Sequence, residues 1–410
     1  MAMPRTFQAF TDRNYRLLWS ANFIATSSRG LLLTLLGWYV LEETGSPWFV
    51  GLVGFCWIFP WFPLGLVGGV LADSSVRKGL LITTQTTGLA SVTIIVVLLA
   101  TGLGEFWHAH VLMLIIGSGD ALDMPTRRSL AHDFLGNRGV TNAVALDSVG
   151  AGSSLMIGPA VAGALIAAFG MTSSGLAAAT LFVSSLVVVS GLSIDKHIHS
   201  SQNKAGIVAT LVDGVKYVAI TPALLSMIII TVIMNLLLFP YMHIVPVIAK
   251  DILGVGPAHM GLLQAMSGLG TLIGSIFIAS LKNVTHHGRI YLAGTVTCFI
   301  GLLLFSVSST YTLSLILVLT IGLGLAGFIS MQSLIAMLVA RQDMRGKALG
   351  VVSLAIGAGP FGALIVSAVA EQVGPSFALL LNAGVGLIMV IVVASIMPAL
   401  RSRMLPDTEV

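Results

Sequence analysis

Charged residues are scarce in this chain. Asp, Glu, Lys and Arg make up only 9% of its 410 residues, whereas soluble domains are about 25% charged. Hydrophobic residues make up 56%, and the mean hydropathy is +0.99. This balance excludes an ordinary soluble domain and predicts an integral membrane protein.

Cysteines and catalytic motifs are also few. Both cysteines, Cys56 and Cys298, fall in apolar segments, which argues against a disulfide framework or a metal site. The chain has no phosphate-cradling loop of the ATPase type and no nucleophile–base pair. Residues 1–16 are polar and basic, and the apolar run that follows is too long for a cleaved leader. We therefore expect no enzyme, no cofactor, no metal and no signal peptide.

Apolar segments recur along the chain, each long enough to cross about 30 Å as a helix. There are twelve of them: 15–41, 49–72, 79–102, 109–134, 140–168, 174–193, 219–247, 259–281, 289–309, 312–339, 347–370 and 376–399. The one long gap follows the sixth. The pattern predicts an all-α membrane protein with an N-terminal six-helix bundle (1–193), a linker (194–218) and a C-terminal six-helix bundle (219–410).

Basic residues set the expected orientation. With the N-terminus inside, Lys250 lies outside and Arg29 within the membrane, and the other 18 of the 20 basic residues lie on the cytoplasmic side. Both termini are therefore predicted to be cytoplasmic.

The linker contains a possible helix of its own. Residues 207–218 place Ile207, Leu211, Val215 and Val218 on one helical face, which predicts a short amphipathic helix on the inner leaflet. A connector with no further role is the alternative.

An internal repeat relates the two halves. Residues 47–53 and 257–263 carry similar sequences at the entry to the second and eighth segments. Two halves in the same orientation imply a pseudo-twofold axis along the membrane normal, and a binding site between them near the midplane.

The loop after the second segment carries a recognisable motif. Gly69, Asp73, Arg77 and Lys78 resemble the signature loop of the major facilitator superfamily, although Ser74 stands where that family usually has a basic residue. The resemblance implies that Asp73 and Arg77 form a conformational latch. As an alternative, Arg77 only anchors the chain at the inner membrane surface.

Further stretches resemble one branch of that superfamily. Residues 13–19, 41–47, 123–130 and 142–148 are similar to exporters such as the enterobactin exporter and macrolide efflux pumps. The resemblance implies a multi-pass protein of the plasma membrane (the bacterial inner membrane) that moves small molecules outward. Its partners would be the cargo, protons and membrane lipids, with no nucleic acid, and it would act as a monomer.

Small residues mark a packing seam. The fifth segment resembles the antiporter motif of the family, and small residues at helical spacing let two helices approach closely. Proline removes a backbone hydrogen bond and permits a bend. The predicted packing and hinge residues are Gly150, Ser154, Gly158, Pro159 and Gly163, with Gly359 and Pro360 in the eleventh segment.

Two opposite charges lie at one depth. At 1.5 Å per residue, Arg29 and Asp120 are each about 21 Å from the inner ends of their segments. Arginine stays charged, so Asp120 is the candidate for proton coupling. Arg29 would bind an anionic substrate or tune Asp120. A permanent ion pair that only fixes the packing is the alternative.

Two further carboxylates lie within apolar segments. Asp123 is four residues before Arg127, so a structural pair is favoured, with proton coupling as the alternative. Asp147 either pairs with Arg127 or Arg128 or titrates during transport. In the second half, the polar candidates for substrate binding are Asn235, Gln332 and Tyr241.

These patterns together predict a secondary active transporter that works by alternating access. Proton-coupled export of amphipathic small molecules, of the drug or siderophore type, is favoured. One alternative is a carrier or uniporter for an anionic metabolite or lipid-like substrate that Arg29 anchors. Another is a receptor of the same fold that does not transport.

Overall fold

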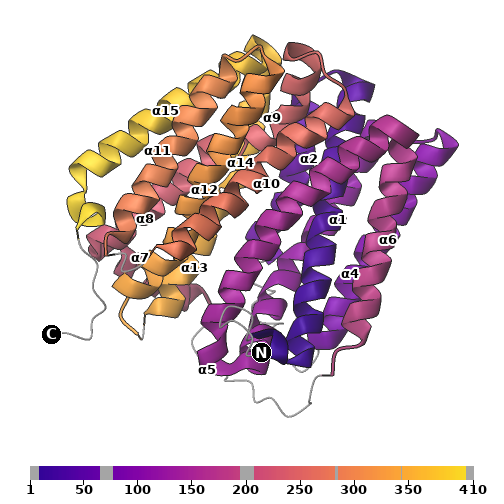
Figure 1. Ribbon diagram of the computed structural model, residues 1–410. Helices are drawn as coiled ribbons and strands as arrows, with labels where there is room; N and C mark the ends of the chain where they lie inside the picture. The colour runs from indigo at the N-terminus through magenta and orange to yellow at the C-terminus, as the bar shows by residue number, and fades with distance from the viewer. Residues whose placement is uncertain (1–8, 65–76, 194–206, 282–284, 343, 403–410) are drawn as a thin grey trace. The chain divides into compact units, whose positions relative to one another are not determined.

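The computed structural model describes residues 9–64, 77–193, 207–281, 285–342 and 344–402, without the side chains of 137–142, 144, 145, 148 and 207–210. Every regular element in this part of the chain is helical (Figure 1). The helices are α1 (Arg13–Thr44), α2 (Pro47–Ile58), α4 (Arg77–Thr101), α5 (Phe106–Phe169), α6 (Met171–Ser190), α7 (Ile207–Ile220), α8 (Pro222–Ile233), η2 (Met234–Leu238), α9 (Tyr241–Val247), η3 (Ile248–Ile252), α10 (Pro257–Ser280), α11 (His287–Ser306), α12 (Tyr311–Val339), α13 (Arg345–Ile356), α14 (Gly359–Val373), α15 (Pro375–Ile396) and η4 (Pro398–Arg401).

Most of these helices are suited to a lipid bilayer. Eleven helical stretches of the described residues are long and apolar enough to cross a membrane. The predicted span 109–134 is helical as well, as the first part of α5, but it carries the charged side chains of Asp120, Asp123, Arg127 and Arg128. The prediction of an all-α, multi-pass membrane protein is therefore confirmed.

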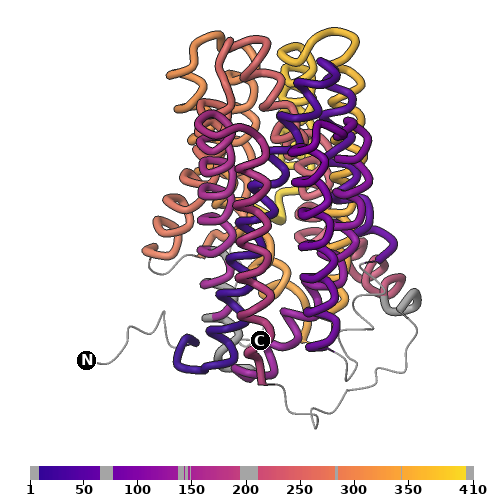
Figure 2. The backbone as a smooth tube through the Cα atoms, turned by 90° about the vertical axis from the view of Figure 1, so that its right-hand side faces the viewer, coloured from indigo at the N-terminus to yellow at the C-terminus, as the bar shows by residue number. Residues whose placement is uncertain are grey.

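The chain divides into two compact units. Unit 1 comprises Met1–Gln202 and Val255–Ala265, and unit 2 comprises Asn203–Gly254 and Met266–Val410. In unit 1, α1 packs against α2, α5 and α6, and α4 packs against α5 and α6, as a group of long, roughly parallel helices (Figure 2). In unit 2, α11 packs against α12 and α15. The domain boundaries that the sequence suggests, at 193 and 218, stay a prediction.

Helix α5 contains two predicted spans in one continuous run. Its 64 residues would reach about 96 Å as a straight helix, but the backbone breaks at Gly136. There φ is 61° and ψ is −179°, in a region that glycine reaches without steric cost. Within α5, Gly136 is therefore the residue at which the backbone departs from helical angles, between the fourth and fifth spans.

The seventh span is a broken helix. Between Pro222 and Ile252 the chain passes through α8, η2, α9 and η3, and both η2 and η3 are π-helical. Pro240 has no N–H to bond the Leu236 carbonyl one turn earlier. Helix α14 comes close at this point: a Cβ on Gly362 would lie 2.8 Å from the Leu236 Cα. A glycine of α14 thus packs on the irregular backbone.

The linker helix is present, and part of its predicted apolar face is exposed. Helix α7 packs against α13, with Gly214 and Val218 buried. Val215, which the sequence places beside Val218 on a lipid-facing stripe, is 44% exposed. The predicted face is therefore divided: Val218 is buried, whereas Val215 is exposed, and the position of this helix on the inner leaflet stays a prediction. The Ile207 side chain lies outside the described part.

Two glycines at the contact of α1 and α5 are expected to differ in tolerance to alanine. A Cβ on Gly158 would lie 2.8 Å from the Ser27 carbonyl oxygen and 3.0 Å from the Leu31 nitrogen, whereas a Cβ on Gly30 would meet nothing closer than 3.6 Å. We expect Gly158→Ala to destabilise the protein by about 1–3 kcal/mol through overpacking. Gly30→Ala is the matched control and should be near neutral. Thermal unfolding in detergent measures both, and equal effects would contradict the close approach.

Candidate functional site

The Arg29 and Asp120 side chains meet inside unit 1. Arg29 comes from the middle of α1 and Asp120 from the first part of α5, and Arg29 Nε lies 2.6 Å from Asp120 Oδ1 in an ion pair. The side chains are only 12% and 7% exposed. Trp57 of α2 donates its indole N–H to Asp120 Oδ2 at 2.9 Å. The two residues that the depth comparison places at one level are therefore in contact.

Asp123 lies one turn further along α5 and has more partners. Arg127 Nε contacts Asp123 Oδ2 at 2.5 Å, as the spacing of four residues predicts, and Arg29 Nη2 reaches the same oxygen at 3.4 Å. Thr84 of α4 donates to Asp123 Oδ1 at 3.2 Å. Arg127 also donates to the Leu18 carbonyl at 3.3 Å. Asp123 is 2% exposed, and its carboxylate holds α1, α4 and α5 together.

The four side chains Arg29, Asp120, Asp123 and Arg127 form one charge cluster. Two positive and two negative charges make it neutral, which lowers the cost of burying it. Arg29 touches both carboxylates, whereas Arg127 makes its ion pair with Asp123. Arg29 therefore bridges the two carboxylates. The Asp120 carboxylate is held by an ion pair with Arg29 and by a hydrogen bond from Trp57, on separate helices.

Asp147 lies at the edge of this group of charges. It is half-buried in the second part of α5, and it interacts electrostatically with Arg128 and, more weakly, with Arg127. One of these arginines also belongs to the charge cluster. Asp147 is therefore linked to Asp123 through Arg127, and its role in proton coupling stays a prediction.

The predicted latch is described only in part. Asp73 lies outside the described residues. Arg77, at the start of α4, is 8% exposed and forms an ion pair with Asp133 of α5. Within unit 1 Arg77 thus fastens the end of α4 to α5, and the latch stays a prediction.

The predicted seam residues line the contact of α1 with the second part of α5. Ser27 donates to Ser154 at 3.2 Å, and a Cβ on Gly150 would lie 3.2 Å from the Trp19 ring. Gly30 lies beside Pro159, since its Cβ would be 3.6 Å from the proline ring. Small side chains thus allow close backbone contact along this seam.

The same helix continues to a second close contact within unit 1. A Cβ on Gly163 would lie 2.9 Å from the Gly261 Cα at the start of α10. One turn later Gln264 accepts a hydrogen bond from Thr34 of α1 at 2.8 Å. The start of α10 is therefore held to α1 and α5 by both backbone contact and a partly buried hydrogen bond.

Unit 2 holds an uncharged hydrogen-bond network. Gln332 donates to the Thr231 hydroxyl at 2.8 Å, and that hydroxyl is 3.1 Å from the Tyr291 hydroxyl. Asn235, in the π-helical η2, donates its side-chain N–H to the Thr231 carbonyl at 2.9 Å. Gly359, just before Pro360, lies beside this site, because its Cβ would be 3.7 Å from Asn235 Oδ1.

Tyr241 belongs to a different contact of unit 2. Its hydroxyl donates to Ser267 at 3.0 Å, and the residue is 1% exposed. The structure therefore brings Asn235 and Gln332 together through Thr231 and leaves Tyr241 apart from them.

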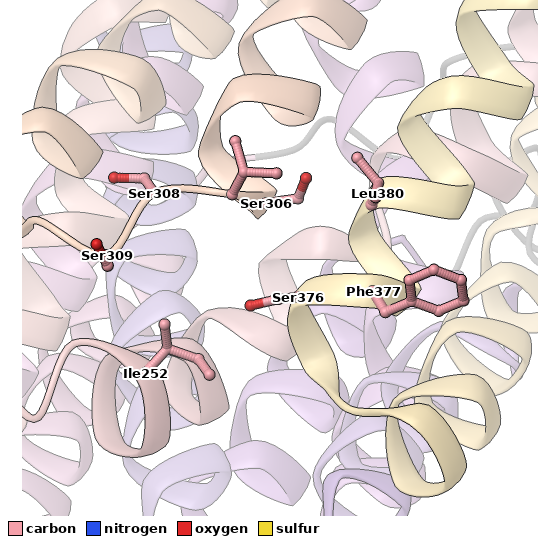
Figure 3. A pocket seen from close by; sticks show the side chains of 8 residues that line it. Ile252, Ser306, Ser308, Ser309, Ser376, Phe377 and Leu380 are labelled. Carbon is pink, nitrogen blue, oxygen red and sulfur yellow. The ribbon is translucent and has the colours of Figure 1, made fainter.

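A cavity of about 300 Å³ lies elsewhere in unit 2 (Figure 3). Uncharged side chains line it: Ile252, Ser306, Val307, Ser308, Ser309, Ser376, Phe377 and Leu380. Among these lining residues there is none of the predicted site residues, so the cavity supports none of the predicted roles.

Comparison with known proteins places the chain in a family. The sequence profile of the major facilitator family described as "Transmembrane secretion effector" matches residues 5–407. The chain belongs to this family. It is therefore a secondary transporter of the major facilitator superfamily and not an enzyme.

Two curated relatives of this transporter cover most of both chains. The multidrug efflux pump Tap of Mycolicibacterium fortuitum is 22% identical over 394 residues, which are 94% of this chain and 96% of Tap. The staphyloferrin A transporter of Staphylococcus aureus is 23% identical over 350 residues, which are 83% of this chain and 85% of the relative.

Solved structures confirm the fold of the transporter. The nucleoside transporter NupG is 15% identical, with a TM-score of 0.68, and the match covers 93% of this chain and 98% of NupG. A peptide transporter POT in complex with sulfate is 12% identical, with a TM-score of 0.72, and the match covers 95% of each chain. At these identities the likeness shows the major facilitator fold alone.

Two residues of the unit 1 site could not be predicted from the sequence. Trp57 and Thr84 both contact the acidic side chains of the cluster, yet each lies in an apolar span where nothing local marks it. A tryptophan in such a span usually packs or faces lipid. Only the packing of α2 and α4 against α5 shows that these side chains face carboxylates.

Proposed function

We propose that this transporter is a proton-coupled exporter of amphipathic small molecules, in which Asp120 binds and releases the coupled proton. The observation that carries the proposal is the position of Arg29 between two carboxylates, at 2.6 Å from Asp120 and 3.4 Å from Asp123. A charge within a membrane span costs about 3 kcal/mol by insertion scales, so such groups are usually functional. The relatives with efflux activity support the outward direction.

Protonation of Asp120 would act through Arg29. When Asp120 takes up a proton it loses its charge, and the guanidinium of Arg29 is then attracted to Asp123 alone. The cluster passes from neutral to a net charge of +1, because Asp123 now balances two arginines. Release of the proton returns Arg29 to Asp120. Proton uptake would thus move a charged side chain of α1 relative to α5, a step that can favour one cavity opening over the other.

The cargo contacts in unit 2 are proposed to be uncharged. Asn235 and Gln332 offer amide groups beside the broken seventh span, and π-helical segments occur often at functional sites. Tyr241 is a candidate only in a conformation that frees its hydroxyl from Ser267. Amide groups on otherwise apolar helices of unit 2 suit the binding of amphipathic molecules.

Purified transporter in proteoliposomes tests the proposal. An imposed pH gradient should drive the movement of fluorescent amphipathic compounds, and a protonophore that collapses the gradient should stop it. Protein-free vesicles and vesicles without a gradient are the controls. If no compound of a broad panel moves in response to the gradient, the exporter proposal fails.

A carrier for an anionic cargo is the second candidate. It is favoured by Arg29, whose charge is permanent, and by the similarity to a staphyloferrin A transporter. The substitution Arg29→Gln distinguishes the proton-coupled exporter from the anion carrier. If the cargo is an anion that Arg29 binds, thermal-shift binding of anions should be lost while the response to a pH gradient remains. If Arg29 couples the proton, the gradient response should be lost instead.

A further inference from the structure

Helix α7 is fixed to the ends of two helices of unit 2. The Tyr217 hydroxyl accepts a hydrogen bond from the Arg341 backbone N–H, just after α12, at 3.1 Å. Asp213 pairs with Lys347 in the first turn of α13 at 3.0 Å. A Cβ on Gly214 would lie 2.9 Å from the Lys347 carbonyl oxygen. The orientation of α7 is therefore set by α13, which lies beside it in Figure 1, and by Arg341 just after α12.

The outward face of α7 carries two aliphatic side chains on either side of a lysine. Val212, Lys216 and Ile220 follow at intervals of four residues, which puts them on one helical stripe. All three are exposed, Val212 by 45% and Ile220 by 79%. Exposed aliphatic side chains do not stabilise a protein surface that faces water. At a membrane surface they can contact lipid, and the lysine between them can extend its ammonium group to the headgroups.

Helix α7 is joined almost directly to a membrane-spanning stretch. Only Thr221 separates α7 from α8, and the stretch Pro222–Ile252 that begins there is long and apolar enough to cross the membrane. Ile220 thus lies at the boundary between headgroups and hydrocarbon. Basic side chains gather at the same end of unit 2, since Arg341 and Arg345 are exposed and Lys347 is bound to α7.

We propose that α7 binds an anionic phospholipid, with Lys216 at the phosphate and with Val212 and Ile220 against the acyl chains. Each lysine or arginine near a membrane surface adds attraction to acidic lipids, and the aliphatic pair adds apolar area. This site is separate from the charge cluster of unit 1 and does not depend on the transport proposal. Because α7 contacts the ends of α12 and α13, their positions would then respond to the lipid composition of the leaflet.

Quenching by brominated lipids tests the site. Val212→Cys, in a Cys56→Ser background, is labelled with an environment-sensitive fluorophore, since the remaining Cys298 is fully buried. In proteoliposomes we expect brominated phosphatidylglycerol to quench the label more strongly than brominated phosphatidylcholine. Lys216→Gln should weaken this preference about five-fold, and added salt should weaken it as well.

Lys250→Gln is the matched control, because Lys250 is an exposed lysine of η3 in the same unit. It should leave the preference unchanged, and both variants should elute from size-exclusion chromatography like the parent. Equal quenching by the two lipids would overturn the proposal, as would an equal effect of the two substitutions. A label that neither brominated lipid quenches would show that protein covers this face, and would overturn it too.

Discussion

Asp120→Asn is expected to reduce gradient-driven transport to the rate of protein-free vesicles while the protein stays folded. The amide cannot exchange a proton near neutral pH, so the proposed coupling site is lost. The fold should survive because the asparagine oxygen can still accept from Trp57, and because Arg29 already lies 3.4 Å from Asp123. Flux of an amphipathic dye, measured with and without an imposed pH gradient, checks this result.

The substitution should also separate coupling from cargo binding. Counterflow, in which labelled cargo exchanges for unlabelled cargo without a gradient, needs no net proton movement and should persist in Asp120→Asn. Asp147→Asn is a useful companion, since Asp147 is the other carboxylate near the cluster arginines. If Asp120→Asn still accumulates cargo against a gradient and Asp147→Asn does not, the proton site must be reassigned to Asp147.

Asp123→Asn is expected to destabilise the protein by about 3–5 kcal/mol, because it removes one partner of a buried ion pair. Arg127, which is 6% exposed, would keep the Leu18 carbonyl and only longer-range interactions with Asp120 and Asp147. Asp120→Asn should cost less, since both arginines would still contact Asp123. Chemical unfolding in detergent micelles, followed by intrinsic fluorescence, measures both variants.

A double substitution distinguishes a lost charge balance from lost packing. Asp123→Asn with Arg127→Gln removes the ion pair as a unit, and it should recover part of the stability because no unbalanced arginine remains at position 127. A double-mutant cycle gives the coupling energy of the pair. If Asp123→Asn destabilises the protein no more than Asp120→Asn does, the additional contacts of Asp123 contribute little to the free energy of unfolding.

Simple geometry was enough to predict two of the ion pairs of unit 1, Arg29 with Asp120 and Asp123 with Arg127. Helical rise placed Arg29 and Asp120 at one depth, and helical periodicity placed Asp123 beside Arg127. Both inferences work because a membrane span is one long helix, so position along the chain converts directly to depth. The same reasoning predicted an all-α membrane protein from apolar segments and short loops.

The lateral contacts could not be predicted in this way. Depth does not say which helix lies beside which, so Trp57 and Thr84 were not foreseen as partners of the two carboxylates. The burial of part of the predicted face of α7 was not foreseen for a related reason. Leu211 lies beside Gly350 of α13, and Val218 is buried. One sequence does not distinguish a protein neighbour from lipid.

The π-helical turn at Met234–Leu238 has a consequence for comparing and engineering these transporters. A π-helical turn holds one residue more than the α-helical turn that it replaces, and one residue corresponds to about 100° of rotation around a helix. A chimera that joins this span to a regular helix from a relative, without allowing for that residue, would turn each later side chain of the span away from its present neighbours. Tyr241 would then no longer point at Ser267.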